Sequence, residues 1–202
     1  MGIFKTLKKI KQLLGLTPVT IKLKKLNGEV IIPKYAHNGD VCVDLTALSM
    51  EYDSEEDMYI YHTGIAIESD EHYGAFLLPR SSNRRTEAYL CNHVGVVDSY
   101  IYRGEIMLCF KNRDSLQSRA LAAKTTKFFE LIEGSKKIKT AVAESNKEWN
   151  KVMENPLQFA PYNVGDRVAQ MVILHYPYVK FKEADELSTT ERGDGGFGST
   201  GN

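Results

Sequence analysis

The sequence predicts an all-β domain, a sandwich or a barrel, with one helical interruption and an amphipathic helix before it. Short runs rich in β-branched and aromatic residues recur along the chain between Gly, Pro, Asn and Asp residues, which is the pattern of strands joined by turns. The apolar period changes from two to about 3.6 in one stretch, from residue 115 to about 154. We therefore expect a helix over 1–16, a β-domain over 17–190 with a helical insertion at about 114–156, and a Gly-rich arm over 191–202.

The first sixteen residues, MGIFKTLKKIKQLLGL, predict a basic amphipathic helix. Apolar residues recur at helical spacing with lysines between them: Ile3, Leu7, Ile10 and Leu14, and Lys5, Lys8, Lys9 and Lys11. The stretch has no continuous apolar core and no small-residue cleavage site, so we do not expect a signal peptide. We expect this helix to pack on its own chain or to fray, and binding to an anionic membrane surface is the alternative.

Five runs predict the strands of the domain. They are VTIKLKKL (19–26), MYIYHTGIAIE (58–68), GAFLLP (74–79), GEIMLCF (104–110) and VAQMVILHY (168–176). In the first of them Ile21 and Leu23 alternate with lysines, as in a strand with one face exposed. Many short strands with turn signals between them favour a sandwich or a barrel.

Two helices are predicted in the interruption, on either side of Gly134 and before Pro156. The first has an apolar face formed by Leu116, Ala120, Leu121, Phe128, Leu131 and Ile132. The second has one formed by Ile138, Val142, Trp149, Val152 and Met153. We expect a helical hairpin whose charged residues form a solvated face.

The composition excludes several classes of protein. The 26 Lys and Arg residues balance 26 Asp and Glu residues, so the chain lacks the basic excess of a nucleic-acid binder. The three cysteines are far apart and form no CxxC pair, which disfavours a zinc site or a disulfide framework and favours a reduced, cytoplasmic setting. No apolar run approaches the roughly 20 residues of a membrane span.

Five polar stretches could carry chemistry. They are NGDVCVDLTA (38–47), PRSS (79–82), NHVGVVDSYIYRGE (92–105), GDRVAQ (165–170) and ERGDGGFGSTGN (191–202). PRSS ends a strand, where a loop can present an arginine fork and two hydroxyls to phosphate oxygens. The stretch 92–105 suggests a hairpin that points Asp98 and Tyr102 into the space it encloses.

Each stretch alone is more often an ordinary turn or a surface ion pair. Together they supply cationic forks, hydroxyl and backbone donors, carboxylates and one aromatic ring. That set suits a polyphosphate attached to a flat base, with a divalent cation held by carboxylates and phosphates.

In this order the stretches resemble the five motifs of the trimeric deoxyuridine triphosphatase (dUTPase) family. The resemblance covers about 34–202 and leaves out the N-terminal helix and the helical insertion. It implies a jelly-roll-like or β-barrel fold and a homotrimer. It also implies Mg²⁺-dependent hydrolysis of dUTP to dUMP and pyrophosphate, in sites built from three subunits and closed by the C-terminal arm.

The resemblance also assigns roles around the base and sugar. Asp98 would orient and activate the water that attacks the α-phosphorus. Tyr102 would pack under the deoxyribose and exclude a 2′-hydroxyl. Asn92 and the main chain around Gly95 and Val97 would read the edge of uracil.

A second set of implied roles concerns the phosphates and the metal. Arg80, Ser81 and Ser82 would hold phosphate oxygens, and Gln170 would add a polar contact there. Asp44 would act in the outer shell of Mg²⁺, through water.

The C-terminal arm would become ordered only over bound nucleotide. Phe197 would stack on the uracil. Arg192, Ser199 and Thr200 would hold the γ-phosphate. Gly198 and its neighbouring glycines would let the main chain approach the ligand.

The sequence departs from the family pattern in two of these motifs. Cys42 stands where the first motif usually has glycine. The hairpin motif has one residue too many between Asp98 and Tyr102, so Tyr100 and Ile101 are alternatives for the sugar-facing position. A bulge is one way to absorb the extra residue.

Two rival functions stay open. RSSNRR, which ends at Arg85, also fits dCTP deaminase of the same fold, alone or as a bifunctional deaminase and dUTPase. That chemistry needs a glutamate where alignment places Cys109. The other rival is a non-catalytic nucleotide-sensing regulatory protein that acts through the helical insertion.

Overall fold

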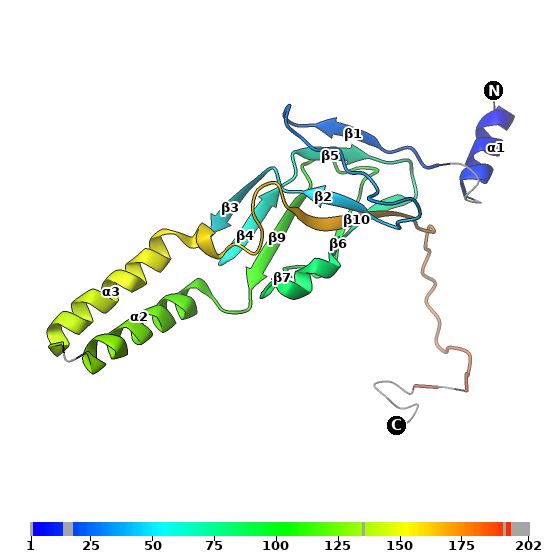
Figure 1. The fold of residues 1–202 in the computed structure, drawn as a ribbon. Helices are drawn as coiled ribbons and strands as arrows, with labels where there is room; N and C mark the ends of the chain where they lie inside the picture. Colours follow the sequence, from blue (N-terminus) through cyan, green and yellow to red (C-terminus); the bar gives the residue numbers. More distant parts are fainter. Residues whose placement is uncertain (1, 14–17, 135, 192, 195–202) are drawn as a thin grey trace.

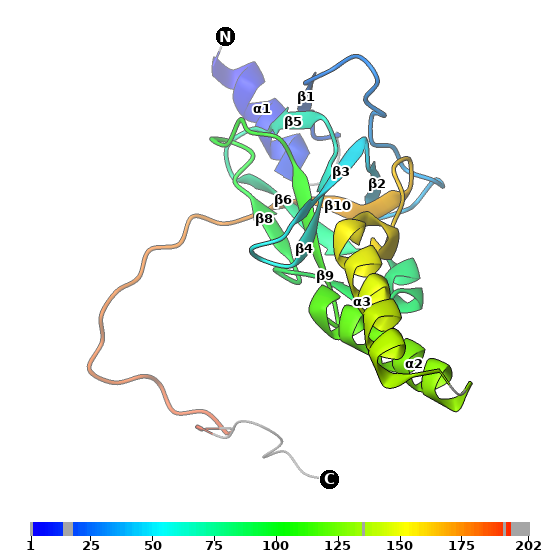
Figure 2. The same cartoon turned by 90° about the vertical axis from the view of Figure 1, so that its left-hand side faces the viewer.

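The computed structural model describes residues 2–13, 18–134, 136–191 and 193–194. It shows a body of β-strands with two projections (Figure 1). One projection is a pair of helices, and the other is the extended segment that follows the last strand. Figure 2, turned by 90°, shows that the extended segment from 176 to 191 leaves the body.

The body contains two four-stranded antiparallel sheets and a two-stranded ribbon. The first sheet has the order β2 (Val43–Thr46), β10 (Arg167–His175), β6 (Tyr73–Pro79), β8 (Gly95–Val97). The second has the order β3 (Ser49–Asp53), β4 (Met58–His62), β9 (Met107–Asn112), β7 (Ala88–Leu90). The ribbon pairs β1 (Lys22–Lys25) with β5 (Ile65–Glu68).

One apolar core joins the two large sheets. The first sheet contributes Leu45, Leu77 and Met171, and the second contributes Tyr61 and Phe110, all of them buried. Among the described strands both sheets keep open edges, so of the two expected arrangements the sandwich is formed and the barrel is not. The predominantly β class is confirmed.

The sequence suggested a single strand over 58–68, and the structure shows two. The run divides at Gly64, and its two halves, β4 and β5, belong to different sheets. Gly64 has φ of +68°, and a Cβ atom there would lie 2.6 Å from both Leu48 Cδ2 and Val30 Cγ2. Only glycine fits that turn without displacing the core. Strands β2, β3 and β7 were missing from the expected runs.

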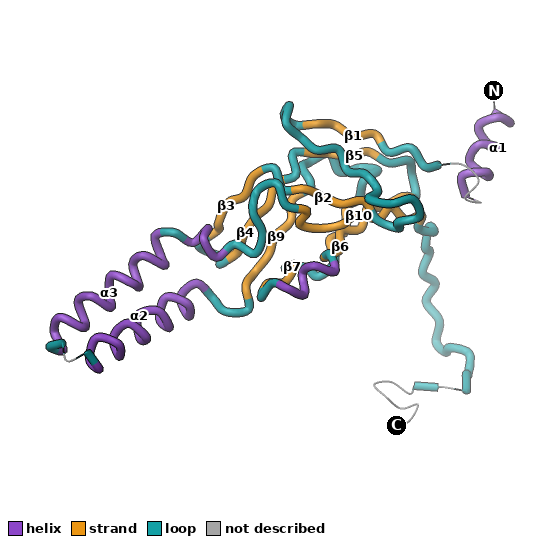
Figure 3. Tube along the Cα trace, in the orientation of Figure 1, coloured by secondary structure: helices purple, strands orange, loops and turns teal. Residues whose placement is uncertain are grey.

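Two helices, α2 (Leu116–Glu133) and α3 (Ile138–Glu154), occupy the stretch with the helical period. Ser115 caps α2, because its Oγ accepts a hydrogen bond from Ser118 N at 3.1 Å. The helices pack side by side and project from the body (Figure 3). The expected apolar faces were wrong for three residues that are exposed: Leu121, Ile138 and Val142. Ala120 and Ala141, which precede Leu121 and Val142, are buried instead.

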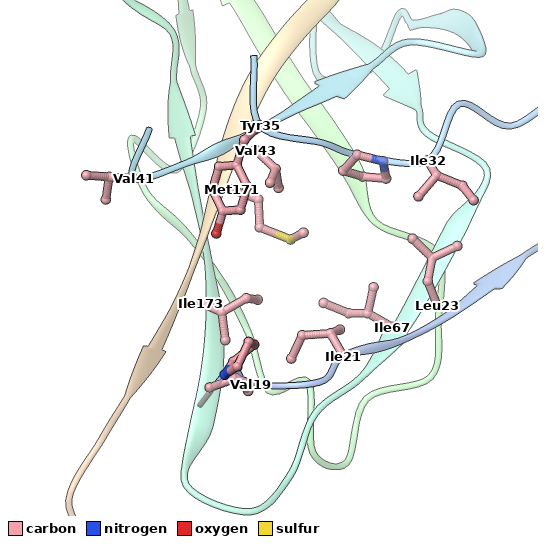
Figure 4. Close-up of a pocket in the computed structure, with 12 residues that line it drawn as sticks. Val19, Ile21, Leu23, Ile32, Tyr35, Val41, Val43, Ile67, Met171 and Ile173 are labelled. Atoms are coloured by element: carbon pink, nitrogen blue, oxygen red, sulfur yellow. The ribbon is translucent and has the colours of Figure 1, made fainter. Parts of the chain in front are cut away.

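A third helix, α1 (Gly2–Leu13), precedes the body. None of the helices in the described ranges is long and apolar enough to cross a membrane. An apolar groove of about 450 Å³ lies between the ribbon and strands β2 and β10 (Figure 4). Val19, Ile21, Ile67, Met171 and Ile173 are among its lining residues.

Candidate functional site

Asp44 on β2 binds two arginines from neighbouring segments. Its Oδ1 lies 2.7 Å from Arg80 Nε, and its Oδ2 lies 2.9 Å from Arg167 Nη1. Arg80 Nη1 also donates to Ser82 Oγ at 3.2 Å. We call Asp44, Arg80, Ser82, Arg167 and Gln170 the arginine cluster.

Strand register brings the members of the arginine cluster together. Gln170 on β10 stands opposite Asp44 on β2 and opposite Leu78 on β6. Its Nε2 donates to Pro79 O at 3.1 Å, just before Arg80 leaves the strand. The 3₁₀-helix η1 (Ser81–Arg85) begins directly afterwards and carries Ser81 and Ser82. The expected placement of PRSS at the end of a strand is confirmed.

The charges of the arginine cluster do not cancel. One carboxylate lies between two guanidinium groups, so the group carries a net positive charge. The side chains of Arg80 and Asp44 are only about one-fifth exposed, 21% and 20%, so their attraction is screened less than that of a surface pair. Ser81 is exposed beside them. This arrangement can accept an anion such as a phosphate group.

Tyr162 supports η1 through a hydrogen bond to Asn83. Tyr162 OH donates to Asn83 Oδ1 at 2.9 Å, and Asn83 Nδ2 donates to Ala88 O at 3.1 Å. Burial raises the pKa of Tyr162, so its hydroxyl stays protonated and remains a donor. These contacts fix the turn that carries Ser81 and Ser82.

The apolar groove of Figure 4 lies on the other face of the same strands. Its residues Val43 and Met171 are the immediate neighbours of Asp44 and Gln170, and successive side chains of a strand point to opposite faces. The groove therefore does not open on the arginine cluster.

The second candidate region is a tight turn from Asp98 to Glu105, which we call the Asp98 turn. The carbonyl of Asp98 accepts hydrogen bonds from Ile101 N at 2.9 Å and Tyr102 N at 2.7 Å. This single helical turn accommodates the extra residue, and no β-bulge is needed. The expected hairpin was wrong, because β8 pairs with β6 while the run after the turn, β9, pairs with β4 and β7 in the other sheet.

Residues beside Asp98 hold this turn rigidly. Ser99 is fully buried, and its Oγ lies 2.8 Å from Ser69 Oγ and 3.2 Å from Tyr73 O. Arg103 donates to the carbonyls of Tyr102 at 2.9 Å and Tyr100 at 2.9 Å. A guanidinium that caps the carbonyls of its own turn restrains the backbone without touching the Asp98 carboxylate.

Glu105 ties the end of the Asp98 turn to the second sheet. Its Oε1 accepts from Gly64 N at 2.7 Å, and its Oε2 lies 3.0 Å from His62 Nδ1. The hydrogen bond that His62 forms with the Glu105 carboxylate is the largest effect on the imidazole and raises its pKa, with a smaller effect in the same direction from the carboxylate of Glu51. A protonated His62 therefore strengthens the link.

The side chains expected to face substrate are on the outside of this turn. Asp98 is exposed, and within the described part of the chain its carboxylate forms no hydrogen bond or ion pair. Tyr102 lies across Gly104, where an added Cβ would come within 2.2 Å of the phenol oxygen, and its OH donates to Glu105 O at 3.1 Å. Tyr100 and Ile101 have no comparable anchor on their side chains among the described contacts.

Asn92 and Gly95 lie at the entrance to β8. Gly95 stands opposite Leu77, and a Cβ there would lie 3.0 Å from Leu77 Cβ and 3.3 Å from Asn92 Nδ2. The absence of a side chain therefore lets Asn92 fold over the strand. Val97 ends the strand directly before Asp98.

The arginine cluster and the Asp98 turn lie at opposite ends of one sheet. Val97 pairs with Ala75, so Asp98 lies level with Gly74 near the start of β6, whereas Arg80 follows the end of that strand. At about 3.3 Å per residue, the backbones of Asp98 and Arg80 are separated by roughly 15–20 Å along the strand. Side chains of one chain therefore cannot place both groups on one phosphate.

Several sequence-based assignments are not tested by this geometry. Arg192, Phe197, Gly198, Ser199 and Thr200 lie outside the described residues. The described residues contain no group of three or more His, Cys, Asp or Glu side chains that could hold a metal ion, so Asp44 does not belong to a preformed metal cluster. Sequence reasoning also gave no role to Arg103, Ser99 and Tyr162, although the first two lie in the quoted motif 92–105.

Comparisons with known proteins agree with this architecture. The dUTPase family model matches residues 28–118 and 157–201, and its gap falls on most of the helical pair. A deoxyuridine 5'-triphosphate nucleotidohydrolase of Thermobifida fusca is 32% identical over 184 residues, which is 91% of this chain and 79% of the relative.

Solved structures show the same fold at lower identity. A mutant dUTPase of Staphylococcus bacteriophage 80alpha with dUpNHpp has a TM-score of 0.59 and 19% identity, and it covers 91% of this chain and 99% of its own. A mutant dUTPase of Staphylococcus aureus phage phi11, described with a structural Mg(II) ion, has a TM-score of 0.54 and 16% identity, over 84% and 99% of the two chains. The chain therefore belongs to the dUTPase family and is a dUTP diphosphatase.

Proposed function

We propose that Asp98 is the base that activates water for attack on the α-phosphorus of dUTP, in a Mg²⁺-dependent reaction that gives dUMP and pyrophosphate. The observation that supports this most directly is the exposed Asp98 carboxylate, which has no partner among the described residues although the backbone beneath it is fixed by Ser99 and Arg103. A carboxylate held in place and left free to accept can orient a water molecule.

The arginine cluster is suited to the phosphates. Arg80 already has its guanidinium aligned by Asp44, so little conformational entropy is lost when a phosphate oxygen binds. Ser81 and Ser82 supply hydroxyl donors beside it. Gln170 contributes mainly by holding Pro79, and this positions the arginine.

The entrance to β8 is suited to the base and sugar. Uracil offers two carbonyl acceptors and one N–H donor, which the main chain of Gly95 and Val97 and the amide of Asn92 can match. Tyr102 is the sugar-facing residue in this account, because its ring is fixed against Gly104 while Ile101 projects freely. A flat ring beneath the deoxyribose leaves no room for a 2′-hydroxyl.

The residues present fit a Mg²⁺ ion whose ligands are mainly substrate phosphates and water. Mg²⁺ commonly binds one or two carboxylates, several waters and substrate phosphates. Asp44 would contact it through water, from a position already between two arginines. When bound, the ion neutralises phosphate charge and so favours nucleophilic attack.

The separation of the two candidate regions supports sites that are shared between the subunits of a homotrimer. The outer face of the first sheet supports assembly, since alternate residues there are apolar: Phe76, Leu78, Val96, Val172 and Leu174. Val96 is 62% exposed. Sheets with two apolar faces are usually covered on both. The extended segment after β10 adds the exposed side chains Tyr178, Phe181 and Leu187, which a neighbouring subunit can bury.

The arm completes the proposed site. Phe197 would stack on uracil, and Arg192, Ser199 and Thr200 would bind the γ-phosphate, while Gly198 permits close approach of the main chain. Bulk water would be excluded once the arm closes, while the attacking water stays at Asp98.

A panel of deoxynucleotides and UTP with Mg²⁺, assayed for pyrophosphate release and for deamination, tests the proposal. We expect pyrophosphate from dUTP alone. Deamination of dCTP would favour the rival activity, although Cys109 occupies β9 where that chemistry needs an acid. Nucleotide binding without turnover would favour a sensor.

A further inference from the structure

The helix α1 shows a wide apolar surface that the described residues of its own chain leave uncovered. Ile3 is 80% exposed and Phe4 83%, while Leu7 and Ile10 are about half exposed. These residues recur at the spacing of one helical face. An apolar face of this extent on a helix that joins no core requires another surface to cover it.

The charge of the region identifies the kind of surface. The helix has four lysines and no acidic residue. In the whole sequence, the first 28 residues contain seven of the 26 basic residues and no Asp or Glu. The other residues contain 19 basic and 26 acidic residues, so a neutral chain has a strongly cationic N-terminal segment and an anionic remainder.

The chain offers α1 an apolar surface of its own, the groove of Figure 4, which begins at Pro18. In the structure, however, the described side chains of α1 are exposed, including Lys5 and Lys11. Contact with the groove would use the apolar face but would leave the lysines without a counter-charge. A surface with an apolar interior and anionic groups around it would contact both the apolar side chains and the lysines of α1.

We infer that α1 is an interfacial helix that binds the chain to anionic lipid membranes. Twelve residues make a helix of about 18 Å, too short to span a bilayer but sufficient to lie in its headgroup region. Ile3, Phe4 and Leu7 enter the acyl boundary, and the lysines contact lipid phosphates. The catalytic body, which is attached through residues after α1, stays in water.

The test uses the full chain and sedimentation with two kinds of vesicle, one of phosphatidylcholine alone and one of equal parts phosphatidylcholine and phosphatidylglycerol. We expect binding to the anionic vesicles that weakens as salt is added, and little binding to the neutral ones. Each lysine replaced by Gln should weaken the partition about fivefold, so a variant with all four α1 lysines replaced should lose more than about 10²-fold.

A matched control removes the same number of lysines from the helical pair: Lys137, Lys139, Lys147 and Lys151. It should bind vesicles like the parent. A second variant, Phe4→Ser with Leu7→Ser, should lose binding although its charge is unchanged. All variants should keep the parent's turnover of dUTP, which shows that they fold.

Three results would overturn the inference. They are failure to bind anionic vesicles, equal binding to neutral vesicles, and binding that survives the loss of all four lysines. Hydrogen exchange measured without lipid tests whether α1 packs on protein instead of on a membrane. Slow exchange in α1 of the parent would show that it already packs on the groove or on a second copy.

Discussion

The arginine cluster and the Asp98 turn are held in contrasting ways. In the arginine cluster the candidate side chains hold each other, with Asp44 between Arg80 and Arg167. In the Asp98 turn neighbouring residues hold the backbone, and the Asp98 carboxylate has no partner among the described residues. A binding group benefits from charge alignment before its ligand arrives, whereas a base must keep its lone pairs available. The two regions therefore suit phosphate binding and proton transfer, respectively.

The largest expected effect tests the free carboxylate. Asp98→Asn should lower turnover by about 10²-fold or more, because the amide is a far weaker proton acceptor while the turn beneath it is unchanged. The readout is steady-state pyrophosphate release. Asp114→Asn, an exposed change before α2, is the control and should be neutral. Near-parental turnover in a folded Asp98→Asn protein would rule out Asp98 as the base.

The second-largest effect is expected when the proposed phosphate-binding guanidinium of Arg80 is removed. Arg80→Ala should lower kcat/KM by about 10²-fold, since one preorganised charged donor is lost. It also leaves Asp44 with only Arg167, so the melting temperature should fall modestly. Arg84→Ala, on the exposed side of η1, is the matched control. If both variants lost the same activity, general surface charge would explain the effect.

A smaller effect is expected from the loss of the Ser99 hydroxyl, which holds the turn beneath Asp98. Ser99→Ala leaves the buried hydroxyl of Ser69 without one of its partners, which should cost about 1–2 kcal/mol of stability. Turnover should fall about tenfold, well short of the loss in Asp98→Asn, because the base is present but less well placed. Ser54→Ala, on an exposed turn, should change neither quantity. Unaltered turnover in Ser99→Ala would mean that the turn needs no such anchor.

The smallest effect concerns pH and the link from Glu105 to His62. The hydrogen bond to Glu105 raises the pKa of His62 above its ordinary value of 6.5. A raised folded-state pKa adds stability that is complete below 6.5 and is lost as the pH rises through the raised value.

His62→Gln should therefore cost up to about 1 kcal/mol in acid solution and less at alkaline pH. Urea unfolding across that range gives the difference between the two proteins. A gap that widens as pH rises would contradict the assigned sign.

Much of this arrangement could be predicted from sequence, because strand period and turn residues are local signals. The strand β10, the loop after Pro79 and the helices around Gly134 are examples. The division of 58–68 at Gly64 could not be predicted, since both halves keep one apolar alternation and only the packing of Leu48 and Val30 requires the break.

Side-chain contacts between distant segments could not be predicted from the sequence either. Nothing in the motifs indicates that Asp44 joins Arg80 to Arg167, or that Arg103 caps carbonyls of its own turn. The false hairpin has a similar cause. Two apolar runs around a polar turn look alike whether they pair with each other or enter different sheets.

The central claim is that Arg80 and Asp98 of one site come from different subunits. Co-expression of Asp98→Asn and Arg80→Ala chains with different tags, followed by purification on both tags, tests it directly. In trimers that carry both tags, about one site in three should be restored, and it uses the intact arginine of one chain and the intact aspartate of another. Mixed oligomers of Asp98→Asn with Asp98→Ala should stay inactive. If the mixed oligomers of Asp98→Asn and Arg80→Ala were no more active than their parents, the two regions would not share a site across subunits.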